Sequence, residues 1–284
     1  MLRVIPSEIP IPLLHQYILG AVSPRPIGFA STVDIDGNPN LSPFSFFNAV
    51  GSNPPTLIFS PARSGRDNTT KNTLDNVEAT KEVVINIVNY SIVQQMSLSS
   101  APYPKGVNEF IKSGLTPIAS EKVKPFRVKE SIVQFECIVK DIYYTGKNGG
   151  AGNIIICEIV LIHINENILD ADGKMDPFKM DLVARMGGDY YCRVIPDSIF
   201  ILPQPKAEMG IGVDVLPDHI RNSKILTGNN LGQLGNCLHF PTAEEIEITK
   251  QLITIDSIDA LHQLAKIKLD EGDFWEGFKI LMTV

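Results

Sequence analysis

Two long apolar segments, residues 132–145 and 153–165, flank a glycine-rich stretch at residues 146–152. This pattern predicts two long antiparallel strands joined by a hairpin. The second segment is apolar at nearly every position, so we expect both of its faces to be buried. The 20 prolines and 21 glycines among 284 residues also interrupt the chain too often for a helical bundle. They favour strands that are joined by turns.

Further strands are expected before this hairpin, at residues 27–33, 40–48, 56–60 and 83–88. The first two predict a hairpin, because an Asp-Gly-Asn turn at residues 36–38 separates them. About six strands with few intervening helices favour a closed or nearly closed antiparallel barrel. A doubly wound sheet would need a regular alternation of strands and helices, which the chain lacks. The predicted fold class is therefore mainly β, with some flanking helices.

The composition changes after the sequence Pro-Gln-Pro at residues 203–205. A glycine-containing stretch follows, and then two segments, 243–254 and 258–269, carry apolar residues at three- and four-residue spacing. Such spacing is typical of amphipathic helices. We therefore expect a β-domain over residues 1–205, followed by a loop and a helical appendage over residues 206–284.

Charge and cysteine usage restrict the class of protein. The formal net charge of −7 disfavours nucleic acid or an anionic membrane surface as the main partner. No apolar run approaches the roughly 18 residues that a membrane-spanning helix needs. The four cysteines are scattered singly without a CxxC pair, so zinc, disulfide and dithiol chemistry have little support. We expect a reduced, cytoplasmic protein.

A polar loop at residues 63–73, with the sequence RSGRDNTTKNT, comes just before a helix predicted over residues 73–80. A helix N-terminus offers free N–H groups and a positive dipole end, which suit a phosphate. Arg63 and Lys71 would add charge-assisted hydrogen bonds. An exposed polar loop with Thr70 or Thr73 as an ordinary N-cap explains the same residues equally well. The loop lacks the glycines of a Walker A motif.

The first predicted hairpin carries hydroxyl and amide side chains beside aromatic ones. Strand alternation places Ser31 and Thr32 on opposite faces. It also places three residues on one face of the return strand and two on the other: Asn40, Ser42 and Phe44, against Ser45 and Phe47. Such a combination suits a flat heteroaromatic ligand. An amphipathic core hairpin is the alternative, and the periodicity alone favours it.

Nucleophilic and acid–base catalysis have little support. The five histidines are dispersed and no GxSxG motif occurs. His163 lies within an apolar strand, where a hydrogen-bonded core histidine is a better interpretation than a catalytic base. The sequence Asp-Ile-Asp-Gly at residues 34–37 is better explained as a turn than as a calcium loop, because the remaining ligands are missing.

Several short motifs, taken in order, resemble the flavin reductase-like family of FMN-binding split-barrel proteins. They extend over residues 15–200 and read SPRPI at 23–27, STVD at 31–34, Gly37, NLSPFSFFN at 40–48, NPP at 53–55, KNT at 71–73, SAP at 100–102, GV at 106–107, EF at 109–110 and GGDYY at 187–191. The resemblance implies a six-stranded antiparallel Greek-key split barrel with flanking helices, assembled as a homodimer.

The resemblance also implies the positions of the cofactor-binding residues. Lys71, Thr73 and Arg63 would hold the phosphate of FMN, and Asn72 would support the loop. The flavin ring or ribityl chain would contact Ser31, Thr32, Ser42, Phe44, Ser45 and Asn48. Asn40 and Ser60 complete the expected set. Residues 99–107 and 187–191 would close over the flavin. Many relatives have Lys-Asp-Thr where this chain has Lys-Asn-Thr at 71–73, which weakens any specific role for Asn72.

The implied activity is that of an oxidoreductase. Hydride would pass from NADH or NADPH to N5 of FMN, and electrons would then pass to an acceptor, such as a partner oxygenase. FAD in place of FMN is less expected. No catalytic side chain is required, because the cofactor carries the chemistry. A non-enzymatic redox carrier or flavin store, and a scaffold protein that has lost flavin, remain alternative functions.

Overall fold

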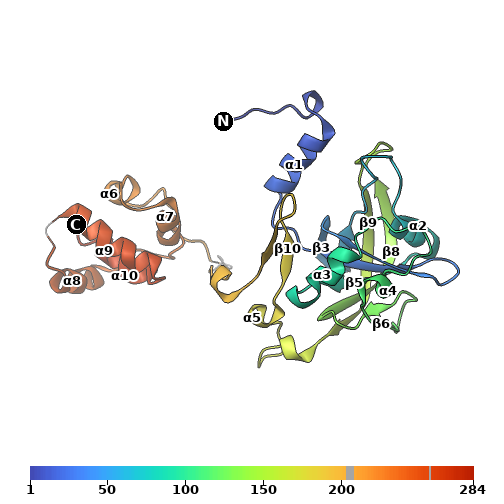
Figure 1. Ribbon diagram of the computed structural model, residues 1–284. Helices are drawn as coiled ribbons and strands as arrows, with labels where there is room; N and C mark the ends of the chain where they lie inside the picture. Colours follow the sequence, from blue (N-terminus) through green and yellow to red (C-terminus); the bar gives the residue numbers. More distant parts are fainter. Residues whose placement is uncertain (203–207, 256) are drawn as a thin grey trace. The chain divides into compact units, whose positions relative to one another are not determined.

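The computed structural model describes residues 1–202, 208–255 and 257–284. The chain divides into two compact units, Met1–Phe200 and Ile201–Val284, and each has a hydrophobic core of its own (Figure 1). The domain boundary predicted at residues 205 and 206 lies outside the described residues. The fold combines a large antiparallel sheet with helices.

The main sheet of the first unit has seven antiparallel strands in the order β2-β1-β5-β8-β9-β4-β3. Their bounds are β1 Gly28–Val33, β2 Pro39–Phe44, β3 Phe47–Ser52, β4 Pro55–Phe59, β5 Glu82–Ile87, β8 Val133–Tyr144 and β9 Asn153–Ile164. The two edge strands, β2 and β3, are joined by Ser45 and Phe46 alone. Because consecutive Cα atoms lie 3.8 Å apart, the ends of these strands are at most about 11 Å apart. The sheet must therefore curl until its edge strands come close at this corner, as in a barrel whose two edges do not pair.

The strand count corrects the sequence prediction. Six strands were expected, with residues 40–48 as one strand. The chain instead bends at residues 45–46, where β2 leaves its partner β1 and β3 begins to pair with β4. One expected strand thus becomes two, at opposite edges of the sheet. The Greek-key arrangement stays a prediction.

The prediction for the second long strand was also wrong in part. In the first half of β9, Ile155 and Cys157 face the interior core and are fully buried. In its second half Val160, Ile162 and Ile164 are 39%, 43% and 38% exposed. Ile162 pairs with Phe135, which packs against the interior cluster. The second half of β9 therefore leaves an exposed apolar stripe on the interior face of the sheet, near the end of the strand.

Two cores lie on opposite faces of the sheet. Inside, α2 (Asn72–Thr80) contributes Leu74 and Val77 to the cluster of the barrel interior. Outside, α3 (Val93–Leu98) and α4 (Glu109–Ser113) contribute to a second cluster with Phe29 of β1. Hence β1, which lies between both clusters, is buried along its whole length.

Shorter elements complete the first unit. They are α1 Ile11–Ala21, α5 Pro177–Met180, the paired strands β6 Pro117–Ile118 and β7 Arg127–Val128, the hairpin β10 Val183–Arg185 and β11 Tyr191–Arg193, and the 3₁₀ turns η1 Pro6–Glu8, η2 Tyr90–Ile92, η3 Glu166–Ile168 and η4 Pro196–Ser198. Helix α1 is apolar, yet none of its residues is buried.

The free edge of β2 has almost no unpaired N–H groups. Successive N–H groups that point out of a strand edge are two residues apart. On β2 these positions are Pro39, Leu41 and Pro43, and the prolines have no N–H. The N–H of Leu41 donates to Glu109 Oε2 of α4 at 3.1 Å. All three outward positions are therefore closed.

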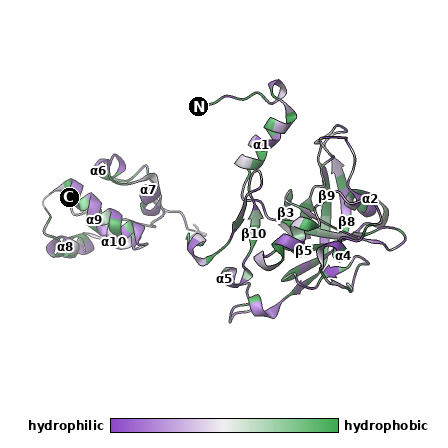
Figure 2. Ribbon diagram, viewed as in Figure 1, coloured by the Kyte–Doolittle hydropathy of each residue, from purple (hydrophilic) through white to green (hydrophobic). Residues whose placement is uncertain are grey.

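The second unit is helical. It contains α6 Asp218–Arg221, α7 Gly228–Gly235, α8 Ala243–Leu252, α9 Ile258–Asp270 and α10 Phe274–Leu281. Figure 2 shows hydrophobic and hydrophilic residues alternating along α9, as an amphipathic helix requires. The sequence predicted α8 and α9 but treated α7 as part of a loop because of its glycines. A capping box between Thr227 and Asn230 starts α7, and Gly235 lets the backbone at Val213 approach closely.

Candidate functional site

The N-terminus of α2 has no side-chain cap. Lys71 occupies the N-cap position, and its carbonyl accepts from the N–H groups of Leu74 and Asp75. The N–H groups of Asn72 and Thr73 have no acceptor within the described part of the chain. Lys71 itself is exposed and forms no ion pair with any described residue. This end of α2 therefore presents free donors and a positive dipole end beside a cation.

A buried hydrogen-bond network fixes this helix end to the first hairpin. Asn40 Nδ2 donates to Thr73 Oγ1 at 2.9 Å and to Thr32 Oγ1 at 3.3 Å. Asn76 Nδ2 donates to the same Thr32 hydroxyl at 3.0 Å. All four side chains are buried. Thr32, Asn40 and Thr73 are bonded to one another and hold α2 in place, and their direct contact with a cofactor stays a prediction.

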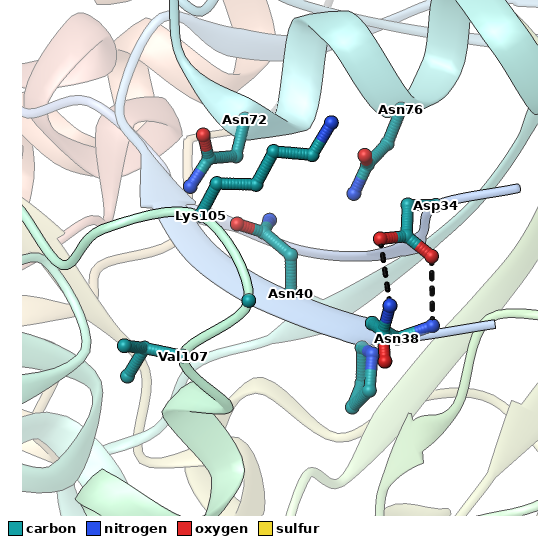
Figure 3. A pocket seen from close by; sticks show the side chains of 9 residues that line it. Asp34, Asn38, Asn40, Asn72, Asn76, Lys105 and Val107 are labelled. Carbon is teal, nitrogen blue, oxygen red and sulfur yellow. Dashed lines mark hydrogen bonds between the residues drawn. The ribbon is translucent and has the colours of Figure 1, made fainter. Parts of the chain in front are cut away.

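A small polar cleft lies beside the first turn of α2 (Figure 3). Asn72 and Asn76 line it from the helix, and the side chain of Lys105 extends across it from the loop before α4. Its volume is about 10 Å³, enough for about one water molecule. Hydrogen bonds from Asn38 lower the pKa of Asp34 at the rim, and the charge of Lys105 contributes.

Lys105 was not among the predicted ligands, although the resemblance places its segment, residues 99–107, over the flavin. Its only sequence signal is a positive charge in an irregular Pro-Lys-Gly stretch, at residues 104–106. Such a stretch predicts a loop but not what the loop contacts. The structure brings this cation into the cleft that Asn72 and Asn76 line, beside the first turn of α2, whose N-cap residue is Lys71.

The loop before α2 is closed by its own side chains. The guanidinium of Arg63 donates to the side chain of Asn68 at 2.7 Å and to its carbonyl at 2.5 Å. The backbone of Arg63 pairs with Ala151 and Gly150 of the β8–β9 hairpin. Arg63, an expected phosphate ligand, therefore acts first as a brace of this loop.

Asn153 is a second residue that sequence reasoning missed. Its backbone N–H donates to the Oγ of Ser60 at 3.0 Å, and its side-chain amide donates to the carbonyl of Pro61 at 2.8 Å. The carbonyl oxygen of that side chain is buried without a partner in the described chain. Ser60, which was predicted as a ligand, thus joins β9 to the start of the loop that precedes α2.

The remaining predicted residues lie along β1, β2 and β3. Phe44 packs inside the barrel with its ring centroid 5.6 Å from that of Phe59. Ser42 and Ser45 are half-buried, and Asn48 is exposed. Ser31 is fully buried, its Oγ has no partner among the described residues, and alternation directs it away from Thr32. The structure therefore does not bring Ser31 together with the others.

His163 lies on β9 outside this region. Its Nε2 is 2.7 Å from Oε1 of the buried Glu136. Burial alone would raise the pKa of Glu136, but hydrogen bonds from the N–H groups of Glu121 and Lys122 and from His163 outweigh it and lower the pKa. His163 is thus a hydrogen-bonded core histidine, as the sequence indicated. The described residues contain no cluster of three or more potential metal ligands.

A large antiparallel sheet that curls into a barrel, with an open helix N-terminus beside a polar strand pair, is the architecture of a split-barrel protein. The chain belongs to the flavin reductase-like family: the model of the flavin reductase like domain matches residues 20–179. The match lies entirely within the first unit, Met1–Phe200. Within the described residues, no helix has the length and apolar composition that would be needed to cross a membrane.

Individual relatives agree with this assignment. An uncharacterised protein of Aquifex aeolicus is 41% identical over 180 residues, which are 63% of this chain and 89% of that protein. Component B of nitrilotriacetate monooxygenase from Bacillus cereus is similar in structure, with a TM-score of 0.66, 27% identity, and coverage of 71% of this chain and 98% of the other. A putative flavin reductase with a split barrel domain from Shewanella frigidimarina has a TM-score of 0.60, 29% identity, and coverage of 70% and 96%.

Proposed function

We propose that this protein is an FMN-binding oxidoreductase that takes hydride from NADH or NADPH and passes the electrons to an acceptor. Bound FMN would supply the hydride-accepting and electron-transferring chemistry. Membership of the flavin reductase-like family supports a flavin as cofactor. The single observation that carries the proposal is the open N-terminus of α2, where Lys71 is the N-cap residue and Lys105 lines the adjoining cleft.

The residues present fit a phosphate-bearing flavin. The free N–H groups of Asn72 and Thr73 provide donors for phosphate oxygens, and Lys71 provides a charge. The buried network of Thr32, Asn40 and Thr73 holds these donors in a fixed orientation. We propose that Ser42, Ser45 and Asn48 contact the remainder of the flavin. FAD is the less favoured cofactor.

The proposed acceptor is a partner oxygenase. Support comes from the relative in Bacillus cereus, which is named as one component of a monooxygenase. In a two-component system, the reductase collects electrons and passes them to a separate oxygenase protein. The four cysteines are all free, which is typical of a reducing compartment, and we place the protein in the cytoplasm.

We also propose a homodimer. Helix α1 has no buried residue, and the stripe of Val160, Ile162 and Ile164 on β9 is exposed. Apolar surface of this kind marks interaction sites. Sedimentation at micromolar concentration checks the assembly, and a monomer at all concentrations would contradict it.

The substitution Lys71→Ala tests the phosphate site. We expect FMN affinity to fall about ten- to a hundredfold, because one charge-assisted contact is lost. Riboflavin affinity should change little, since riboflavin has no phosphate. Fluorescence titration of both ligands measures the difference. Lys174→Ala, which removes an exposed lysine from a surface turn, is the matched control. An equal loss for FMN and riboflavin would place the phosphate elsewhere.

The oxidoreductase proposal has its own test. Under anaerobic conditions, NADH or NADPH should bleach the absorbance of the flavin bound to the purified protein. Failure of both donors to bleach it would favour a redox carrier or flavin store. A protein that binds neither added FMN nor riboflavin would reject both functions.

A further inference from the structure

Arg25 is a buried cation without a carboxylate partner. Its side chain is 4% exposed, and within the described residues no acidic side chain forms an ion pair with it. Burial and the nearby charge of Arg185 both lower the pKa of Arg25. A buried charge that is not neutralised is costly unless its hydrogen bonds are satisfied. The hydrogen-bond partners of Arg25 should therefore account for its burial.

The guanidinium of Arg25 joins three segments that are distant in sequence. One Nη donates to the carbonyls of Leu19 and Val22 at the end of α1, at 2.5 and 2.6 Å. The other Nη donates to the carbonyl of Met186, in the turn of the β10–β11 hairpin, at 2.8 Å. Nε lies 3.5 Å from the hydroxyl of Ser45, between β2 and β3. The planar fork of an arginine can satisfy these directions together, whereas a lysine cannot.

The backbone strengthens the same junction. The N–H and carbonyl of Arg25 both pair with Arg185 at 2.9 Å. Gly187 comes so close to α1 that a Cβ at residue 187 would lie 3.3 Å from Cα of Gly20. Arg185 in turn bonds the carbonyl of Gly188 and the hydroxyl of Tyr191, both at 2.7 Å. Arg25 thus holds the turn at 186–190 against α1, and Arg185 braces the turn from within its own hairpin.

We propose that Arg25 is a positioning residue that fixes a wall made of Ser45 and the turn at 186–190, of which the proposed function assigns Ser45 to the flavin. This inference rests on the proposed function for the flavin itself. The contact from Nε occupies a lone pair of the Ser45 oxygen, so that the hydroxyl proton is left to donate to a ligand. Arg25 acts through these groups and does not need to touch the flavin.

Flavin affinity separates this role from that of Lys71. Arg25→Lys keeps the positive charge but removes the planar guanidinium. We expect FMN and riboflavin to bind about tenfold more weakly, both to the same extent. Lys71→Ala should weaken FMN alone. The two variants should therefore show different patterns of affinity loss. If Lys71→Ala contradicts the phosphate proposal, the result for Arg25→Lys can still be interpreted.

A double-mutant cycle tests whether Arg25 acts through Ser45. We expect Arg25→Lys to cost much less affinity in a Ser45→Ala background than in the natural protein, because the shared contact is already absent. Fully additive losses would overturn the proposal. Unchanged riboflavin affinity in Arg25→Lys, with a folded protein by circular dichroism, would also overturn it.

Hydrogen exchange on the flavin-free protein supplies a measurement that does not depend on the cofactor. The amides of residues 186–190 and of the last turn of α1 should exchange faster in Arg25→Lys, while those of α2 should keep their rates. If the turn exchanges at the natural rate, Arg25 does not hold it and the proposal fails.

If Arg25→Lys is poorly folded, Ser45→Ala alone should still weaken the binding of both flavins equally. A selective loss of FMN affinity would contradict the role assigned to this wall.

Discussion

Individual residues in this protein show how far a role can be inferred from residue type. Arg63 and Lys71 are both cations of one polar loop, and the sequence treats them alike. The structure separates them, because Arg63 bonds Asn68 whereas Lys71 stays exposed at the N-cap of α2. Arg25 and Met186 are 161 residues apart, and no local pattern predicts their contact. Single polar contacts across such separations depend on tertiary packing, which one sequence does not reveal.

Glu136 provides a prediction at the residue scale. Its side chain is fully buried and accepts from two N–H groups and His163. Because its pKa is lowered in the folded protein, its contribution to stability is present above the unfolded pKa near 4.5 and is lost as pH falls through the folded pKa. Glu136→Gln should destabilise the barrel at pH 7 by about 1–3 kcal/mol. It should also remove this part of the acid dependence.

Urea unfolding at pH 7 and at a series of acidic pH values measures the effect of Glu136→Gln. Glu158→Gln, on the neighbouring strand, is the control, because its carboxylate forms a surface ion pair with Lys140. Equal effects of both substitutions would show that the buried hydrogen bonds of Glu136 contribute little.

At the scale of helices and strands, the sequence is a better guide where glycine and proline act as ordinary turn signals. The first hairpin, the two long strands and α8 and α9 are predicted because apolar periodicity and turns agree. The split between β2 and β3 is not, since residues 45–46 are Ser-Phe and carry no turn signal. Helix α7 is missed for the opposite reason, because its glycines lie within a helix, and Gly235 serves close packing rather than a turn.

Helices α6 and α9 share a histidine pair, a half-buried His219 and a buried His262, whose hydrogen bonds require both rings to be neutral. Ser223 Oγ accepts from the N–H groups of Ile225 and Leu226, so its proton must donate to His262 Nδ1, 2.9 Å away. His262 Nε2–H then donates to His219 Nδ1 at 3.4 Å. An added proton on either ring places two donors face to face. Acid should therefore loosen the contact between α6 and α9.

The pH window for this effect follows from the pKa directions. Burial lowers the pKa of both histidines below 6.5, and the charge of His219 lowers that of His262 further, against an opposing contribution from Asp259. The stabilisation is complete above pH 6.5 and is lost as pH falls toward the folded pKa values. His262→Gln should reduce this loss, as thermal unfolding between pH 7 and 5 would measure. The exposed His15→Gln is the control, and an unchanged pH profile for His262→Gln would contradict the interpretation.

The whole molecule consists of a family domain and a helical unit that the family model does not cover. The division was expected from the change in composition, and the relatives named above cover only 63–71% of the chain. The sequence does not predict what the helical unit does. Several of its polar residues cap helices or form ion pairs, which are structural roles. The separate cores make independent unfolding a reasonable expectation.

Calorimetry tests that expectation. We expect two thermal transitions, of which FMN raises only the one that belongs to the barrel. A ligand at one hundred times its dissociation constant stabilises its unit by about 2.7 kcal/mol. Riboflavin at the same concentration should raise the barrel transition less, since it lacks the phosphate contact. A single transition that FMN shifts as a whole would mean that the two units unfold together.

The closed edge of β2 restricts how this protein can associate with others. Proteins often recruit an extended peptide, or aggregate, by adding a strand to an exposed sheet edge. Pro39 and Pro43 offer no donor there, and Glu109 already occupies the N–H of Leu41. Strand addition is therefore blocked along β2. In the main sheet, a partner that pairs with backbone groups is left with the edge of β3, whereas one that docks beside β2 must recognise side chains.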